Sequence, residues 1–172
     1  MRLFIAVPLP GDIMRKVYVY EQQMQQNGVT GRFVPRGNHH ITLRFIGESN
    51  ALADIADAMH EAVKDARPFT LKLGAYGQFT HGGGRTGYLS VTGDTSELFR
   101  IHETLEAALN DRGLGRGKGR LQPHITLGRS LDGGTLPADT PEGSLRINSI
   151  VLYESTAEKG RMVYMPLHTE KF

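Results

Sequence analysis

A repeated tetrapeptide contains the residues of this chain that are best suited to chemistry. The sequence His-Ile-Thr-Leu occupies residues 40–43 and recurs 84 residues later at 124–127. Each copy follows a polar or proline-containing loop and has the composition of a β-strand. Because side chains at positions i and i+2 of a strand point the same way, His and Thr share one face of each strand, while Ile and Leu occupy the other. The repeat therefore predicts two strands that each present an imidazole and a hydroxyl.

If the two strands lie side by side, these side chains suit proton transfer at a phosphate group. A neutral imidazole accepts a proton from water, and an imidazolium donates one to a leaving oxygen. An in-line displacement at phosphorus needs the acid and the base on opposite sides, which two related strands supply. His40 and His124 are therefore the predicted acid and base, in an order that the residues leave open. Thr42, Thr126 and Arg129 are the predicted phosphate-binding residues, because hydroxyls and a cation stabilise the charge that develops there.

Other chemistries match the sequence less well. The chain has no cysteine, which excludes disulfide bonds, thiol catalysis and iron–sulfur ligation. Neither motif contains an Asp or Glu to complete a metal site, so no metal or other cofactor is expected. No serine nucleophile elbow is present, and the glycines at 82–84 lie in a predicted hairpin loop without the lysine of a P-loop. One alternative stays open: a nucleotide- or RNA-binding module that binds phosphate with the two motifs but does not catalyse a reaction.

Composition and charge predict a soluble, cytoplasmic protein with an anionic partner. The 172 residues contain no apolar run near the ~20 residues that a membrane span needs, and a monomer without membrane contact is expected. Lys and Arg number 20 against 18 Asp and Glu, yet the glycine-rich segment 112–120 holds four cations and no acid. Without this segment the net charge would be −2. An anionic partner is therefore expected at the segment.

Periodicity and turn residues predict an α+β fold with helices outside a mixed or antiparallel sheet. A doubly wound parallel sheet fits poorly, because hairpins are frequent and no glycine fingerprint follows the first strand. Three helices are predicted at 12–27, 50–67 and 95–109, and strands at 3–7, 39–46, 69–79, 86–92, 124–129, 146–154 and 161–168. Residues 31–35 are predicted to form a short strand or a turn.

Five further polar residues have weaker expectations. Arg44 shares the parity of the first motif, which predicts either a place in the groove or an exposed position at the strand end. His39 has the opposite parity and is predicted to be structural or partly exposed at the start of the strand. His60 and His102 lie on predicted helices and are expected at the surface, while His81 is a candidate for the border of the groove.

Both motifs and both ends of the chain resemble those of a known family. HITLRFIG at 40–47 and PHITLGR at 123–129 are similar to the paired HxT motifs of the two-histidine (2H) phosphoesterases. They are most similar to the branch of RNA 2′,3′-cyclic phosphodiesterases, also called 2′-5′ RNA ligases. The opening strand at 2–10 and the closing hairpin, with 151–155 and 163–167, resemble that branch as well. The resemblance therefore covers nearly the whole chain.

The resemblance implies a bilobal, pseudo-symmetric α+β fold in which two antiparallel or mixed sheets flank a central groove. Residues 1–172 would form one domain of two intertwined lobes, with one motif each, around 40–43 and 124–127. It also implies metal-independent opening of a terminal 2′,3′-cyclic phosphate, on RNA or on a nucleoside 2′,3′-cyclic phosphate, to a 2′-phosphate. It also implies a reversible 2′-5′ RNA ligase activity at the same site.

The resemblance also implies a role for each motif residue. His40 corresponds to the proton donor to the leaving 3′ oxygen and His124 to the proton acceptor, while Arg129 matches the arginine after the second motif. On an RNA substrate, Arg116, Lys118 and Arg120 of the basic segment are expected to contact backbone phosphates upstream of the cyclic end.

Overall fold

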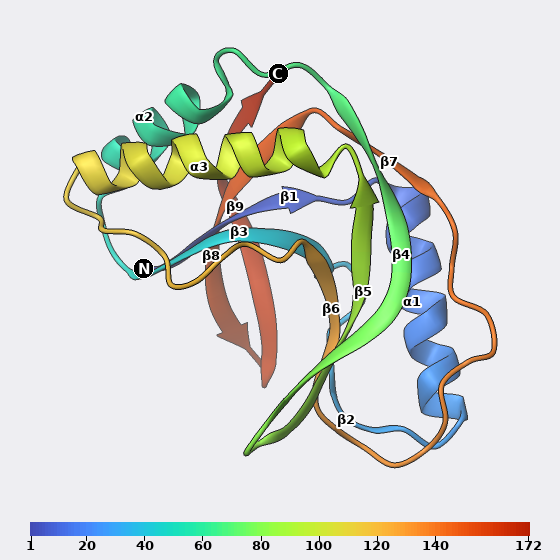
Figure 1. Cartoon of the computed structure of the whole chain (residues 1–172). Coiled ribbons are helices and arrows are strands. Elements are labelled where there is room, and N and C mark those ends of the chain that lie inside the picture. Colours follow the sequence, from blue (N-terminus) through green and yellow to red (C-terminus); the bar gives the residue numbers. More distant parts are fainter.

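The computed structural model shows nine strands in one strongly curled sheet, with three helices packed against it (Figure 1). It describes residues 1–80 and 82–172, together with the course of one strand through His81. The strands are β1 (Arg2–Pro8), β2 (Thr30–Phe33), β3 (His40–Glu48), β4 (Phe69–His81), β5 (Gly84–Gly93), β6 (His124–Asp132), β7 (Ser144–Ile147), β8 (Ser149–Glu158) and β9 (Arg161–Lys171). The helices are α1 (Gly11–Gln26), α2 (Leu52–Val63) and α3 (Thr95–Asp111).

The sheet consists of two halves that meet at the motif strands. Its order is β7-β4-β5-β6-β3-β1-β8-β9, with β2 also paired to β6, and the described pairs are antiparallel. At the centre, β3 and β6 pair at Ile41 and Ile125. The predicted α+β class is confirmed, and the two predicted sheets are the two halves of one hydrogen-bonded sheet.

Each motif strand ends a similar run of elements. β1 and α1 precede β3 along the chain, with the short strand β2 between α1 and β3, and β3 pairs antiparallel with β1. β5, α3 and β6 repeat this order, and β6 pairs antiparallel with β5. The two tetrapeptides therefore begin equivalent strands at the centre of the sheet.

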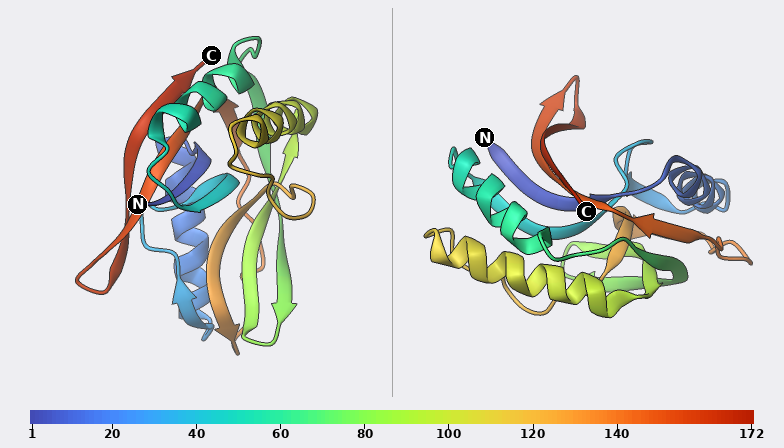
Figure 2. Two further views of the ribbon diagram at one scale, coloured as in Figure 1. Left: turned by 90° about the vertical axis from the view of Figure 1, so that its left-hand side faces the viewer. Right: turned by 90° about the horizontal axis from the view of Figure 1, so that it is seen from above.

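The helices are amphipathic, and each buries one stripe of side chains. In α1 the stripe consists of Ile13, Val17, Tyr20 and Met24, at the spacing of three or four residues that places them on one side of a helix. α2 and α3 lie side by side, whereas α1 lies at the opposite side of the molecule (Figure 2). Among the described residues, no helix has the length and apolar character needed to cross a bilayer.

The single strand predicted at 146–154 is two strands, β7 and β8, because the chain changes partners at Asn148. β7 pairs with β4 at one edge of the sheet, whereas β8 pairs with β1 in the other half. Asn148 lies between the two strands. Both segments are apolar enough to form strands, so local sequence does not mark the break, which follows from pairing with distant neighbours.

Candidate active site

The two motifs lie on neighbouring strands and face each other. β3 and β6 run antiparallel and pair through the isoleucine of each motif. Continuing this register places His40 opposite Thr126 and Thr42 opposite His124. All four side chains are half-buried, whereas both isoleucines are fully buried on the other face. With strands ~5 Å apart and alternate residues ~7 Å apart, the Cα atoms of the two histidines are roughly 8 Å apart on the diagonal.

Backbone carbonyl groups fix the tautomer of both histidines. His40 Nδ1 lies 2.7 Å from the carbonyl oxygen of Asn38, and His124 Nδ1 lies 2.6 Å from that of Gln122. Because a carbonyl oxygen only accepts hydrogen bonds, Nδ1 carries a proton in each ring and donates it. Nε2 is therefore the atom that gains and loses a proton. In His40 this atom lies 2.8 Å from Thr42 Oγ1.

Burial lowers the pKa of His40 below its ordinary value of 6.5. The hydrogen bond to the Asn38 carbonyl opposes this shift, while neighbouring positive charges, including that of Arg129, lower the pKa further. The neutral ring is thus favoured when the groove holds no anion. A phosphate bound between the histidines would add negative charge and favour the imidazolium form, which a proton donor needs.

Two β-bulges decide which side chains follow the motifs into the groove. Directly after the threonine of each motif, one residue has no partner on the neighbouring strand: Leu43 of β3 opposite β1, and Leu127 of β6 opposite β5. Each strand has a second such irregularity farther along. A bulge shifts the alternation of side chains by one position. It brings Phe45 and Arg129, which stand at equivalent positions of the two strands, to the exposed face, and Phe45 is 65% exposed. Of the two positions that simple alternation allowed for Arg44, the exposed strand end is wrong, because its side chain is only 7% exposed; Arg44 instead belongs to the lining of the groove.

Aromatic rings flank the two histidines in the same manner. No spacing pattern in the sequence marks these rings. The contacts hold each imidazole from the side without adding charge. Each imidazole has two aromatic neighbours whose ring centroids lie within 5.5 Å of its own. These are Phe4 and Tyr164 for His40, and Phe79 and Tyr88 for His124.

The groove consists of two pockets that share Thr42 and Phe45. The pocket that we call the His40 pocket has a volume of about 660 Å³ and is also lined by Arg2, Phe33, His40, Thr126, Arg129 and Tyr164. The His124 pocket has a volume of about 800 Å³ and is also lined by Phe79, His102, His124 and residues 116–122. Within the described part of the chain, no three His, Cys, Asp or Glu side chains gather in a way that could hold a metal ion.

The basic segment forms the wall of the His124 pocket, and its backbone is anchored from below. Arg44 and Glu106 are 7% and 5% exposed and form an ion pair with an Nη1–Oε2 distance of 3.0 Å. The Arg44 guanidinium also donates to the carbonyl oxygens of Leu114 and Gly115, at 2.8 and 3.2 Å. Glu106 accepts the N–H of Gly117 at 2.6 Å. The glycine-rich segment therefore has a fixed course beside the groove.

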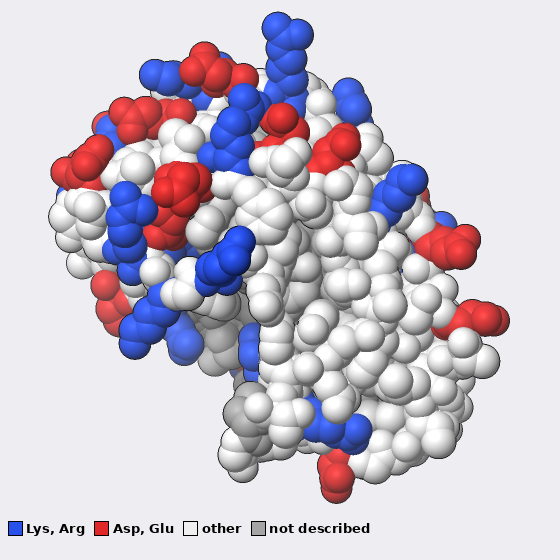
Figure 3. All heavy atoms as spheres, in the orientation of Figure 1, with Lys and Arg blue, Asp and Glu red and all other residues white. Residues whose placement is uncertain are grey.

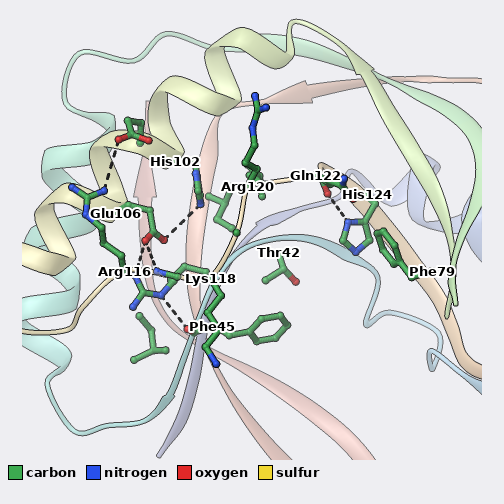
Figure 4. Close-up of a pocket in the computed structure, with 17 residues that line it drawn as sticks. Thr42, Phe45, Phe79, His102, Glu106, Arg116, Lys118, Arg120, Gln122 and His124 are labelled. Atoms are coloured by element: carbon green, nitrogen blue, oxygen red, sulfur yellow. Dashed lines mark hydrogen bonds and ion pairs between the residues drawn. The ribbon is translucent and has the colours of Figure 1, made fainter. Parts of the chain in front are cut away.

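The cations of this segment stand at the edge of the pocket. Arg116, Lys118 and Arg120 are exposed, and Arg116 lies 3.8 Å from Glu103 on α3. In Figure 4 these three residues occupy one side of the pocket, with His124 at the other end and Phe45 between them. Lys and Arg side chains gather around a hollow below α3 in the space-filling view (Figure 3).

Four of the five histidines outside the motifs had predicted positions, and their outcomes differ. His39 is buried with its Nε2 2.9 Å from Glu21, which confirms the predicted structural role. His60 is exposed, as predicted. The surface position predicted for His102 is wrong, because its side chain is only 16% exposed and lines the His124 pocket. The side chain of His81 lies outside the described residues.

The curled antiparallel sheet and the two facing His-x-Thr motifs define a two-histidine phosphoesterase. Within this class, the chain belongs to the 2′-5′ RNA ligase superfamily, whose family model matches residues 22–156.

Sequence and structural relatives agree with this placement. The RNA 2′,3′-cyclic phosphodiesterase of Aeropyrum pernix is 31% identical over 156 residues, which cover 84% of this chain and 88% of that protein. The protein of the same name from Escherichia coli is 28% identical over 167 residues, covering 96% and 93% of the two chains. The crystal structure of E. coli LigT complexed with 3′-AMP has a TM-score of 0.76 at 27% identity, covering 99% of this chain and 97% of LigT.

Proposed function

We propose that this protein is an RNA 2′,3′-cyclic phosphodiesterase that opens a terminal 2′,3′-cyclic phosphate to a 2′-phosphate by general acid–base catalysis with two histidines. The observation that carries the proposal is the pair of His-x-Thr motifs on antiparallel neighbouring strands, each with Nδ1 held by a carbonyl group. Membership of the family and the names of the relatives support it. In this proposal residues 1–172 form one domain of two intertwined lobes.

The reaction needs one proton transfer at each histidine. Nε2 of His124 accepts a proton from water as the water oxygen bonds to phosphorus. The bond from phosphorus to the 3′ oxygen breaks, and Nε2 of His40 gives its proton to that oxygen. The products are a 2′-phosphomonoester and a free 3′-hydroxyl. The order of acid and base follows the resemblance of the motifs to those of the family.

Three side chains would hold the reacting phosphate. Thr42 and Thr126 lie opposite the histidine of the other motif, where their hydroxyls can donate to non-bridging oxygens. Arg129 lines the His40 pocket together with Thr126 and would balance negative charge that develops at phosphorus. The exposed Arg116, Lys118 and Arg120 would contact backbone phosphates of RNA. A 2′-5′ ligase activity at the same site would be the same displacement with a 5′-hydroxyl in place of water: its oxygen bonds to phosphorus, its proton passes to His124, and the bond to the 3′ oxygen breaks.

Turnover of a nucleoside 2′,3′-cyclic phosphate tests the proposal. We expect hydrolysis to the 2′-phosphate, identified by phosphorus NMR against both standards, and severe loss of activity in His40→Ala and His124→Ala. His60→Ala is the matched control, since it removes an exposed imidazole outside the groove. Binding without turnover would instead identify a non-catalytic module that binds phosphate. A 3′-phosphate product would show that the roles of the histidines, or the orientation of the substrate, are reversed.

A further inference from the structure

The carbonyl group that orients His40 belongs to a tight turn just before β3. Residues 35–38 form this turn, which the N–H of Asn38 closes on the carbonyl oxygen of Pro35 at 3.0 Å, with Gly37 at a φ of 90°. A positive φ at the third of four turn residues favours glycine. Asn38 is therefore both the last residue of the turn and the residue whose carbonyl oxygen lies 2.7 Å from His40 Nδ1.

The side chain of Asn38 joins this turn to the β8–β9 hairpin. Its Nδ2 donates to the carbonyl oxygen of Met162 at 2.9 Å, between residues 124 positions apart. β9 is the last strand of the sheet, so its outer edge has carbonyl groups without a strand partner, and Asn38 donates to one of them. The hairpin stands out from the rest of the sheet (Figure 2). The bond to Asn38 therefore ties the hairpin to the turn that orients His40.

The same strand also contacts the ring of His40. Tyr164, two residues after Met162, packs edge-on against the imidazole with 5.5 Å between the ring centroids. Met162 and Tyr164 line the His40 pocket together with Ser155 of β8. β9 therefore acts on the position of His40 in two ways, through the ring of Tyr164 and through the turn that the Asn38 side chain holds.

The second motif reaches the same geometry by other means. His124 Nδ1 lies 2.6 Å from the carbonyl oxygen of Gln122, and the residue between them is Pro123. The proline ring fixes its own φ and restricts the preceding residue to extended conformations, so the backbone itself holds this carbonyl group. At the equivalent position of the first motif stands His39, which imposes no such restriction.

We propose that Asn38 is a positioning residue for the proton donor: by tying its turn to β9, its side chain holds the carbonyl group that binds Nδ1 of His40 and leaves Nε2 as the atom that donates. The proposal rests on the proposed function for the role of His40. It makes the two motifs unequal, because the donor depends on the β8–β9 hairpin, whereas the backbone at Pro123 holds the carbonyl group beside the acceptor.

Loss of this tie should change the proton affinity of His40 and leave that of His124 unchanged. The hydrogen bond to the Asn38 carbonyl raises the pKa of His40, against the larger and opposite effect of burial. If the turn moves away from the ring, this bond weakens and the pKa falls. Less of the donor is then protonated at high pH. The free energy of one hydrogen bond corresponds to a factor of about 2–12, which sets the size of the expected effect.

Asn38→Ala tests the proposal, and Asn38→Leu lacks the same donor while keeping nearly the same side-chain size. The substrate is a nucleoside 2′,3′-cyclic phosphate. We expect both variants to lower kcat/KM about 2- to 12-fold at pH 8 and by a smaller factor at pH 5, because the basic limb of the pH profile moves to lower pH. The loss should lie in kcat, with KM nearly unchanged. The matched control, Asn110→Ala, removes an exposed amide at the end of α3 and should behave as the wild type.

NMR titration of the free variants measures the ring itself. His40 should have a lower pKa than in the wild type, and the nitrogen chemical shifts of its neutral ring should show a larger share of the tautomer with the proton on Nε2. His124 should keep both its pKa and its tautomer, which makes it an internal control. Thermal unfolding verifies that the variants are folded.

Several outcomes would overturn the proposal. An unchanged pKa of His40, an equal change at His124, or the same loss of kcat/KM at both pH values would show that Asn38 does not act through the ring of His40. A change confined to KM would overturn it as well, by making Asn38 a substrate contact. If the wild type failed to open a cyclic phosphate, the proposed function would be rejected, while the titration of His40 would still test the positioning role of Asn38.

Discussion

The buried ion pair beneath the basic segment gives a prediction whose size follows from its surroundings. Arg44 and Glu106 are both less than a tenth exposed, and the contact joins residues 62 positions apart in the chain. Arg44→Met would leave the carboxylate of Glu106 buried with the N–H of Gly117 as its remaining short hydrogen-bond donor. Removing one partner of a buried pair costs about 3–5 kcal/mol of the free energy of unfolding.

The effect should be measurable as a change in melting temperature. For a chain of this length, each kcal/mol lowers Tm by about 2–4 °C, so Arg44→Met should melt about 6–20 °C lower than the wild type. Glu106→Leu should show a loss of similar size, because it leaves the guanidinium buried without its carboxylate. The double variant removes both charges, and we expect it to recover most of the lost stability, since apolar replacement of a buried pair is often neutral.

The double variant also separates stability from positioning. It lacks the donors to the carbonyl oxygens of Leu114 and Gly115 and the acceptor for Gly117, so the basic segment loses its anchors even though the fold is stable. We expect KM for RNA substrates to rise more than KM for a cyclic mononucleotide. Thermal unfolding followed by circular dichroism, together with both KM values, measures the two effects. If Arg44→Met lowered the free energy of unfolding by less than about 1 kcal/mol, the buried, anchoring role of the pair would be refuted.

Three further predictions concern the histidines. His40→Ala and His124→Ala should each lower turnover by roughly 10²–10⁴, and the double variant by much less than the product of the two, because the residues act as a unit. We expect His39→Ala to lower stability rather than turnover. If His39→Ala lowered turnover as much as the other two variants, the register of the first motif would be wrong by one residue. Activity should survive EDTA, because imidazoles carry out both proton transfers, and a loss that a divalent ion restores would contradict this mechanism. By NMR titration, His40 should have a pKa below 6.5 in the free protein, because burial and Arg129 disfavour its charged form. Arg129→Ala should raise this pKa, as should a bound 2′-phosphate product, whereas a decrease in either experiment would show that the charges near the ring are assigned wrongly.

Much of the secondary structure and the core of the site could be predicted from the sequence, because both depend on local periodicity. Alternation within each tetrapeptide was enough to place His and Thr on one face, and the repeat indicated that the two strands belong together. Helices and most strands followed from the spacing of apolar residues and from glycine and proline at their ends. The aromatic rings beside the histidines left no such signal, because they come from strands far apart in the sequence.

Tertiary contacts decided what local patterns left undetermined. Alternation left Arg44 either in the groove or exposed at the strand end, but beside a bulge against β1 its side chain is buried in the lining of the groove, and Phe45 is the exposed residue. The equivalent bulge in β6 brought Arg129 to the same face as the second motif. A bulge depends on the register with a neighbouring strand, which a single segment does not encode. The same reason applies to the anchor of the basic segment, since Arg44 meets Glu106 only after a strand and a helix from different parts of the chain have packed together.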